Sequence, residues 1–233
     1  SKQFKIGCTK EQSVLGSFIS LFSGVGPTRV IWALRGVSFA VSPGEIVGII
    51  GKNGSGKSTL LRLIAGIYDK SCGRIKTLGK VVPLINLNLG MYQYLTMLDN
   101  IYFISSFFGL SRGEMAGTFD SIARFSELED FLDAKICQFS EGMRQRLVFS
   151  IAVHSCPGIL LLDEVFEVGD REFRAKSAHM IKELVAGGVT VVLVSHNLDL
   201  IEKYCDRAIW LEEGKVKDDG PAAEVVEKYK GSA

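Results

Sequence analysis

Eight consecutive residues in the first quarter of the chain have the types and spacing needed to hold phosphate groups. Residues 51–58 have the sequence GKNGSGKS, which matches the pattern GxxxxGK(S/T) at every fixed position. Glycines let successive backbone N–H groups turn inward around phosphate oxygens, where side chains would collide. In this pattern Lys57 reaches the β- and γ-phosphates and the hydroxyl of Ser58 binds Mg²⁺. The residues expected to contact a nucleotide here are Gly51, Asn53, Gly54, Ser55, Gly56, Lys57, Ser58 and Thr59.

Two carboxylates follow an apolar run later in the chain. Residues 159–162 are continuously apolar, and Asp163 and Glu164 come directly after them. A strand buried on both faces delivers its last residues to the carboxyl edge of a parallel sheet, where Mg²⁺ would lie beside the phosphates. Asp163 is therefore a candidate Mg²⁺ ligand, and Glu164 is a candidate base for the water that attacks the γ-phosphate. The alternative, a solvated acidic turn, is less attractive in a chain that also has a phosphate loop.

A histidine stands at the end of a second apolar run. Residues 189–194 are predicted to form a buried strand, and His196 follows it closely. Its imidazole is therefore expected at the same edge of the sheet, where it could hydrogen-bond the γ-phosphate. His154 and His179 fall within predicted helices, and for them we expect a structural role.

Short β-branched runs alternate with helical segments along the chain, which indicates a parallel sheet with helices on its faces. The strand candidates are residues 37–41, 45–50, 80–85, 159–162 and 189–194. The helix candidates are residues 57–67, 97–108, 112–124, 141–154, 171–184, 198–204 and 222–230. The predicted fold class is α/β, with a more helical part between about residues 90 and 155. The phosphate loop lies between a strand and a helix, as phosphate binding requires, and this context disfavours an ordinary glycine-rich turn with a surface lysine.

Composition excludes several classes of protein. The chain has 233 residues, 47% of them hydrophobic, which suits one large domain or two small ones with a substantial core. Its 27 Lys and Arg balance 26 Asp and Glu, so a polybasic nucleic-acid arm is excluded as the main theme. The five cysteines include no CxxC pair, which argues against a disulfide scaffold or a zinc site. No apolar run reaches the roughly 18 residues that span a bilayer.

The order of four motifs resembles the nucleotide-binding domain of ABC transporters. The phosphate loop is followed by FSEGMRQRL at 139–147, LLLDEVFEVGD at 160–170 and VSHN at 194–197. The resemblance covers about residues 32–230. It implies one P-loop NTPase domain of the ABC-ATPase fold over residues 1–233, with a mostly parallel sheet, an N-terminal β subdomain and a helical subdomain. It also implies ATP and Mg²⁺ as cofactors, and ATP hydrolysis as the activity.

The same resemblance implies roles for residues outside the phosphate loop. Ser140 and the Gly142 backbone, in a segment that replaces the common LSGGQ, would bind the γ-phosphate of ATP held by a second copy. Asp170 matches an aspartate that crosses the dimer interface. Trp32 is similar to an aromatic residue that stacks on adenine, the alternative being a half-buried core tryptophan.

One position departs from the family pattern. The glutamine expected after the strand at 80–85 is missing, and Asn86 or Asn88 stands there instead. An amide oxygen can still reach Mg²⁺ or water, although asparagine is one methylene shorter. Asn86 is our candidate and Asn88 the alternative, because the placement of the gap decides between them.

The implied mechanism is that of a homodimer. Two ATP molecules would lie between the phosphate loop of one copy and the 140–142 segment of the other. Glu164 would act as the base, while Lys57, Mg²⁺ and His196 stabilise the charge on the γ-phosphate. Opening and closing of the dimer would then drive a separate transmembrane permease.

Three features narrow the resemblance to the ATPases of polysaccharide exporters: the Met in FSEGM, the phrase DEVFEVGD and the segment WALRGVSF. That branch implies export of a lipid-linked O-antigen, capsule or teichoic acid, handled mainly by the permease. The ATPase would sit peripherally on the cytoplasmic face of the bacterial inner membrane. Alternatives are an ABC ATPase for another exported substrate, a soluble ABC protein of translation or chromosome maintenance, and a small-molecule P-loop kinase.

A last segment is unusual for the wider family. Residues 13–22 place apolar side chains with the spacing of an amphipathic helix. We expect this helix to lie near the permease or the bilayer surface, or else to cover the core of its own domain.

Overall fold

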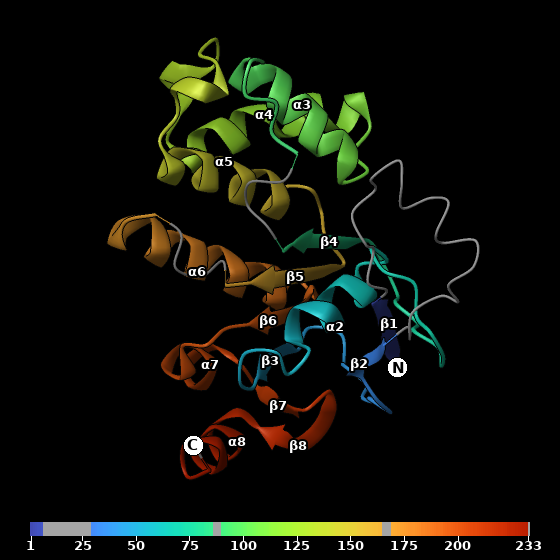
Figure 1. The fold of residues 1–233 in the computed structure, drawn as a ribbon. Helices are drawn as coiled ribbons and strands as arrows, with labels where there is room; N and C mark the ends of the chain where they lie inside the picture. Colours follow the sequence, from blue (N-terminus) through green and yellow to red (C-terminus); the bar gives the residue numbers. More distant parts are fainter. Residues whose placement is uncertain (7–28, 86–89, 165–168, 233) are drawn as a thin grey trace, which may run out of the picture.

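The computed structural model describes residues 1–6, 29–85, 90–164 and 169–232. A six-stranded sheet with the order β4-β5-β6-β3-β7-β8 forms its centre (Figure 1). The first five strands in that order pair in parallel, and β8 pairs antiparallel to β7. The strands are β3 (Ile46–Ile50), β4 (Val81–Leu84), β5 (Ile159–Asp163), β6 (Thr190–Val194), β7 (Arg207–Glu212) and β8 (Lys215–Pro221).

Helices cover both faces of the sheet. The helices are α2 (Lys57–Ile64), α3 (Met97–Phe107), α4 (Arg112–Ser126), α5 (Glu141–Val153), α6 (Arg171–Ala186), α7 (Leu198–Tyr204) and α8 (Ala222–Lys230). Two 3₁₀ turns, η1 (Glu129–Phe131) and η2 (Ile136–Gln138), connect α4 to α5. In Figure 1 the helices α3, α4 and α5 form a group beyond the β4 edge of the sheet.

Strand β3 separates two apolar clusters because successive side chains point to opposite faces. Val47 and Ile49 pack in one cluster with Leu61 of α2. Ile46 and Ile50 pack in the other, which also contains buried residues of α5, α6, α7 and α8. Since every residue of β3 is buried, this strand fixes the position of whatever follows it.

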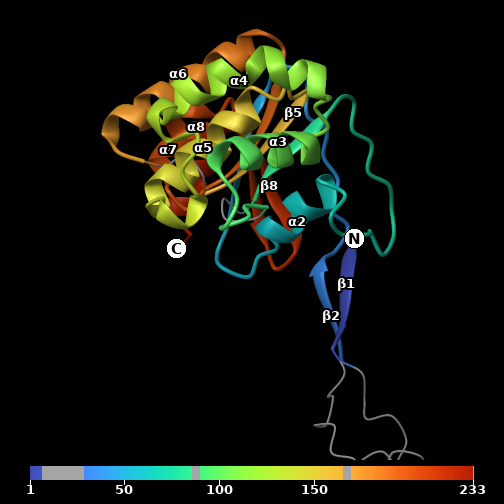
Figure 2. The ribbon, with the colours of Figure 1, turned by 90° about the horizontal axis from the view of Figure 1, so that it is seen from above.

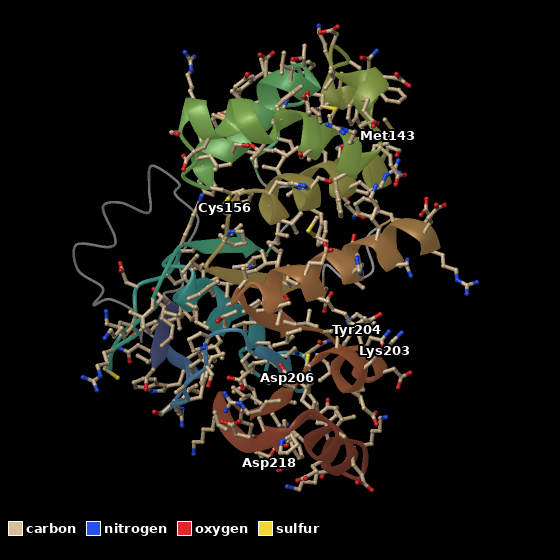
Figure 3. The ribbon with its side chains drawn as sticks, turned by 180° about the vertical axis from the view of Figure 1, so that it is seen from behind. Met143, Cys156, Lys203, Tyr204, Asp206 and Asp218 are labelled. Carbon is tan, nitrogen blue, oxygen red and sulfur yellow. The ribbon has the colours of Figure 1, made fainter. Side chains whose placement is uncertain are left out.

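The C-terminal part of the chain is tied back to the sheet by polar contacts. The backbone N–H of Ile46 donates to the carboxylate of Asp206 at 2.8 Å, just before β7 begins. Lys228 of α8 pairs with Asp218 of β8 at 2.7 Å. Figure 3 labels the two acceptors, Asp206 and Asp218. The β7–β8 hairpin is therefore bound to β3 where β7 begins, and to α8 along its outer strand β8.

A separate antiparallel hairpin is formed by β1 (Lys2–Ile6) and β2 (Arg29–Leu34). Figure 2 shows it projecting away from the main sheet. Its inner end is fixed, because Leu34 is buried in the cluster that α2 shares with β3.

The predicted α/β fold class is confirmed, and each helix predicted from residue 57 onward is present with ends that differ by at most a few residues. The predicted strand at 37–41 is wrong: these residues pair with no strand in the described part of the chain. Val37, Phe39 and Val41 are half-buried against the α2 cluster, and the carbonyl of Ala40 accepts a hydrogen bond from Arg207. The alternation of apolar residues at 37–41 therefore reflects burial of one side of this segment. It does not indicate hydrogen bonding to a neighbouring strand. The prediction missed β1, β2, β7 and β8.

Within the described residues, no helix has both the length and the apolar character that crossing a membrane would require.

We expect Gly48 in β3 to be required for packing. A Cβ at this position would lie 2.8 Å from Cγ2 of Ile201 in α7 and 3.0 Å from Sγ of Cys205, the C-cap of that helix, and both residues are buried. Gly48→Ala should lower the free energy of unfolding by about 1–3 kcal/mol, because overpacking a close-packed core forces strain. Urea unfolding measures this.

Gly117 is the matched control, since a Cβ there meets nothing within 4 Å in the middle of α4. Gly117→Ala should raise stability by about 0.5–1 kcal/mol through helix propensity. Equal effects at the two positions would contradict the packing argument.

Candidate nucleotide-binding site

The phosphate loop lies between the end of β3 at Ile50 and the start of α2 at Lys57. Gly51, Gly54 and Gly56 have φ values of 145°, 81° and 105°, which L side chains rarely adopt. A Cβ at Gly51 would lie 2.2 Å from the carbonyl oxygen of Leu211. The loop therefore needs glycine both for its conformation and for its contact with β7.

The N-terminus of α2 is open to an anion. Its N-cap is Gly56, and among the described residues no side chain accepts a hydrogen bond from the first N–H groups at that cap. The first turn contains no acidic residue. Unpaired N–H groups and the positive end of the helix dipole together favour a bound anion.

Lys57 is held inside the loop. Its Nζ donates to the carbonyl oxygens of Gly51 at 2.7 Å and Lys52 at 3.1 Å, and the residue is buried. Burial lowers the pKa of this ammonium group, against the attraction of Glu164 and Asp163. A phosphate oxygen would offer Lys57 a negatively charged acceptor in place of two neutral carbonyls.

Asp163 ends β5 beside the start of α2. Burial is the main cause that raises the pKa of its carboxyl group; repulsion from Glu164 adds to the rise, and a hydrogen bond from Ser58 opposes it. A hydroxyl and a carboxylate are oxygen ligands that suit Mg²⁺, so Ser58 and Asp163 together could hold this ion. Ser55 Oγ, buried in the same loop, finds no hydrogen-bond partner among the described residues. These polar oxygens fit a loop that binds a charged ligand.

Glu164 and His196 meet at the carboxyl edge of the sheet. His196 Nδ1 lies 3.1 Å from Glu164 Oε1, and both side chains are more than half exposed. The pairing follows from topology, because β5 and β6 are adjacent parallel strands and both residues stand just after them. Glu164 has a left-handed backbone (φ 58°), and its N–H donates to Val194 at 2.9 Å. The structure therefore brings together the two residues that sequence analysis placed at this edge.

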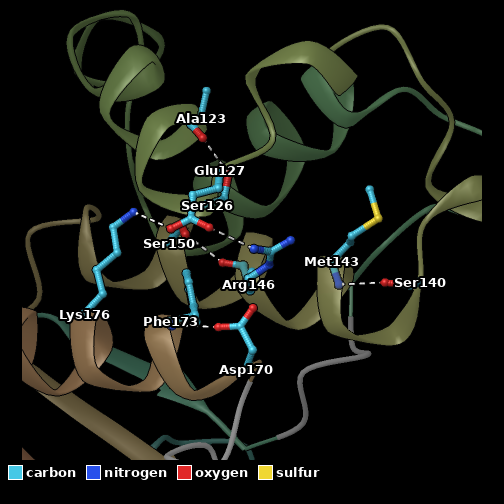
Figure 4. A network of polar contacts seen from close by, with 10 residues as sticks. All are labelled: Ala123, Ser126, Glu127, Ser140, Met143, Arg146, Ser150, Asp170, Phe173 and Lys176. Carbon is cyan, nitrogen blue, oxygen red and sulfur yellow. Dashed lines mark hydrogen bonds and ion pairs between the residues drawn. The ribbon is translucent and has the colours of Figure 1, made fainter.

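Ser140 and Asp170 are both helix N-caps. Ser140 Oγ accepts from the N–H of Met143 at 3.2 Å at the start of α5, and an Asp170 oxygen accepts from Phe173 at 2.9 Å at the start of α6 (Figure 4). Gly142 lies in the first turn of α5. Within the described residues, neither N-cap side chain hydrogen-bonds to the phosphate loop, so one copy of the chain does not unite these groups with it.

Trp32 lies on β2, with 36% of its surface exposed. The guanidinium carbon of Arg35 is 5.8 Å from its ring centre. The next residue, Ala33, faces the phosphate loop, since a Cβ on Gly56 would lie 2.7 Å from the Ala33 carbonyl oxygen. The indole is thus available near the start of α2. The predictions for Asn86, Asn88 and residues 13–22 lie outside the described residues.

Sequence analysis missed the turn between β7 and β8. Gly214 N–H donates to the carbonyl of Ser55 at 3.1 Å, and its own carbonyl accepts from Arg35 N–H at 2.7 Å. Glu213 and Gly214 both have positive φ, as a tight hairpin turn requires. The sequence signal was weak: Glu213-Gly214 follows the apolar run 208–211 and precedes residues 215–217, which alternate in polarity, but Glu-Gly is not among the dipeptides typical of such turns.

The sequence is similar to those of a known protein family and of several named proteins. A model of the ABC transporter family matches residues 34–167. The "O-antigen export system ATP-binding protein RfbB" of Klebsiella pneumoniae is 41% identical over 202 residues, which cover 87% of this chain and 82% of that protein. The protein of the same name from Myxococcus xanthus is 40% identical over 201 residues, but the chain spans only 46% of its length. The "Teichoic acids export ATP-binding protein TagH" of Listeria innocua is 37% identical over 229 residues, covering 98% and 67%.

Solved structures share the fold. An "ATP binding subunit of ABC transporter" superposes with a TM-score of 0.75 at 26% identity, covering 88% of both chains. A dimeric structure of the ATP-binding cassette MJ0796, bound to ADP and Pi, gives a TM-score of 0.72 at 27% identity and covers 83% of this chain and 92% of that one. With a matching family model over more than half of its length and close relatives over most of it, this chain belongs to the ABC transporter family of ATP-binding proteins.

Proposed function

We propose that this protein is the ATP-hydrolysing subunit of a bacterial exporter of lipid-linked polysaccharide. The observation that carries the proposal is the meeting of four groups at one edge of the sheet: the phosphate loop, Asp163, Glu164 and His196. Relatives named for O-antigen and teichoic acid export support the substrate class.

ATP would bind with its phosphates in loop 51–58, at the open N-terminus of α2. Lys57 would exchange its two carbonyl acceptors for β- and γ-phosphate oxygens. Ser58 and Asp163 would hold Mg²⁺, which when bound neutralises phosphate charge during transfer. Trp32 would stack on the adenine, a role that its exposed ring allows.

Hydrolysis would depend on Glu164. Its carboxylate would take a proton from the attacking water as that water approaches the γ-phosphate. His196 holds this carboxylate through Nδ1, which leaves Nε2 as the ring nitrogen that can reach a phosphate oxygen. Both side chains are exposed, so water and phosphate can reach them.

A second copy would complete the site. The α5 N-terminus, with Ser140 and Gly142, presents donors that suit a γ-phosphate, and Asp170 starts the neighbouring α6. Because one copy does not bring these caps to its own phosphate loop, a head-to-tail homodimer is the arrangement that would use them. The dimeric MJ0796 structures support it at the level of the family.

A separate permease would dock on aromatic side chains around α3. Five of them are exposed and form what we call the α3 aromatic face: Tyr92, Tyr94, Tyr102, Phe103 and Phe107. Tyr94 is 81% and Phe107 is 77% exposed, which is unusual for rings unless another surface covers them. Bound to the permease, the subunit would lie peripherally at the cytoplasmic face of the inner membrane.

Glu164→Gln should reduce ATP turnover at least a hundredfold, because an amide cannot accept the proton of the attacking water. ATP binding should persist, and an ATP-bound dimer should accumulate on size-exclusion chromatography. Lys57→Ala is the control and should lose ATP affinity with no dimer. Brisk turnover by Glu164→Gln would exclude Glu164 as the base.

Asp163→Asn should separate stability from function. Without ligand, a partly buried carboxylate beside Glu164 costs stability, so the amide should raise Tm by about 2–4 °C, the shift that about 1 kcal/mol gives in a domain of this size. Mg²⁺-dependent ATP hydrolysis should fall to background. Differential scanning calorimetry measures Tm, and a phosphate-release assay measures ATP hydrolysis. Full ATPase activity in Asp163→Asn would contradict the assignment of Asp163 as a Mg²⁺ ligand.

Export can be tested in the source bacterium by deleting the gene and restoring variants. Deletion should leave lipid-linked glycan inside the cell and remove it from the surface. The double variant Tyr94→Ser/Phe107→Ser should bind ATP normally but fail to restore surface glycan. Ile67→Ser changes an exposed apolar residue away from this face and should restore export. Normal surface glycan in the deletion strain would contradict the proposed substrate.

A further inference from the structure

One carboxylate joins the helices that begin at Ser140 and Asp170. Glu127 Oε2 accepts from Arg146 Nη1 of α5 at 3.1 Å, and Oε1 accepts from Lys176 Nζ of α6 at 2.9 Å (Figure 4). Arg146 follows Ser140 by six residues, and Lys176 follows Asp170 by six. At a rise of about 1.5 Å per residue, Glu127 therefore links the two helices at equal distances, about 9 Å, from their N-caps.

The backbone of Glu127 lies in the left-handed region that favours glycine. Glu127 terminates α4 with φ 59° and ψ 42°, and the cap is closed by the N–H of Leu128 donating to Ala123 at 3.3 Å. Glycine, or sometimes asparagine, is the usual residue at such a left-handed cap, because a longer side chain strains it. A glutamate here accepts that strain while placing its carboxylate between two cations.

Aromatic rings hold both cations in place. The guanidinium carbon of Arg146 is 5.8 Å from the ring centre of Phe173, and Lys176 Nζ is 4.9 Å from that of Phe125. The two rings pack edge to face with 5.8 Å between centres, and Phe173 is fully buried. Arg146 is only 19% exposed at its side chain. The side chains of Glu127 and Lys176 are 45% and 36% exposed, and the aromatic contacts of the two cations join the ion pairs to the core of the junction among α4, α5 and α6.

We propose that Glu127 is a positioning residue that sets the placement of Ser140 relative to Asp170. The inference rests on the proposed function, in which both N-caps face the nucleotide of a second copy. With Glu127 in place, α5 and α6 present their N-termini as one surface. Without Glu127, α5 and α6 would be free to shift relative to each other. Dimer closure would then also have to align their N-termini, so a smaller fraction of ATP-bound dimers would reach the conformation that hydrolyses ATP.

The test uses Glu127→Gly, which removes the carboxylate but suits the left-handed backbone. We expect kcat for ATP to fall about tenfold, with KM within about twofold and Tm within a few degrees of wild type. Glu127→Asp keeps a carboxylate and should recover at least half of the lost kcat. Glu129→Gln, at an exposed acid of η1, is the control and should behave as wild type.

A second measurement separates this inference from the proposed function. In a Glu164→Gln background, Glu127→Gly should lower the ATP-driven dimer fraction several-fold while ATP affinity of the monomer is unchanged. Absence of any ATP-driven dimer in Glu164→Gln alone would overturn the proposed function and this inference with it. Wild-type kcat and dimerisation in Glu127→Gly would overturn the positioning role alone, and so would a loss of kcat matched by a large fall in Tm.

Discussion

The architecture depends on one steric constraint: the chain between β3 and α2 has to curl with its N–H groups inward and its outer side pressed against other backbone. Gly51 meets the carbonyl of Leu211, and Gly56 meets that of Ala33, both at distances that leave no room for a Cβ. Several elements of the fold hold the phosphate loop in these two contacts. The buried central strand fixes where the loop starts, α2 fixes where it ends, and β2 and β7 form its walls.

The parallel sheet then solves a second problem, which is to collect groups that are distant in sequence. Asp163 and Glu164 follow β5 while His196 follows β6, and pairing of these adjacent strands brings Glu164 and His196 to 3.1 Å. Burial differs across this short edge: Asp163 is largely enclosed beside Ser58, whereas Glu164 and His196 face solvent. In the proposed function, the enclosed carboxylate would hold Mg²⁺, while the exposed Glu164 and His196 would meet the attacking water and the phosphate.

The sequence was sufficient for those parts of the molecule whose chemistry is local. Residues 51–58 carry a pattern in which each fixed position has its own physical reason, and continuous apolar runs identified β5 and β6. It was insufficient where contacts are long-range. Residues 37–41 alternate like a strand but pack as an unpaired segment, because pairing depends on which neighbours are present. The contact of Gly214 with Ser55 joins residues that are distant in the chain, and the link from Glu127 to α6 likewise could not be inferred from spacing.

The wall that β7 and its turn provide has a consequence for how the protein is made. Synthesis runs from the N-terminus, so the phosphate loop leaves the ribosome well before Leu211 and Gly214 are added. Until then the loop lacks the backbone of Leu211, against which Gly51 packs. The carbonyl of Ser55 also lacks its hydrogen-bond donor, the N–H of Gly214. The shape of the phosphate loop is thereby tied to the arrival of β7 and its turn, which lie far from the loop along the chain.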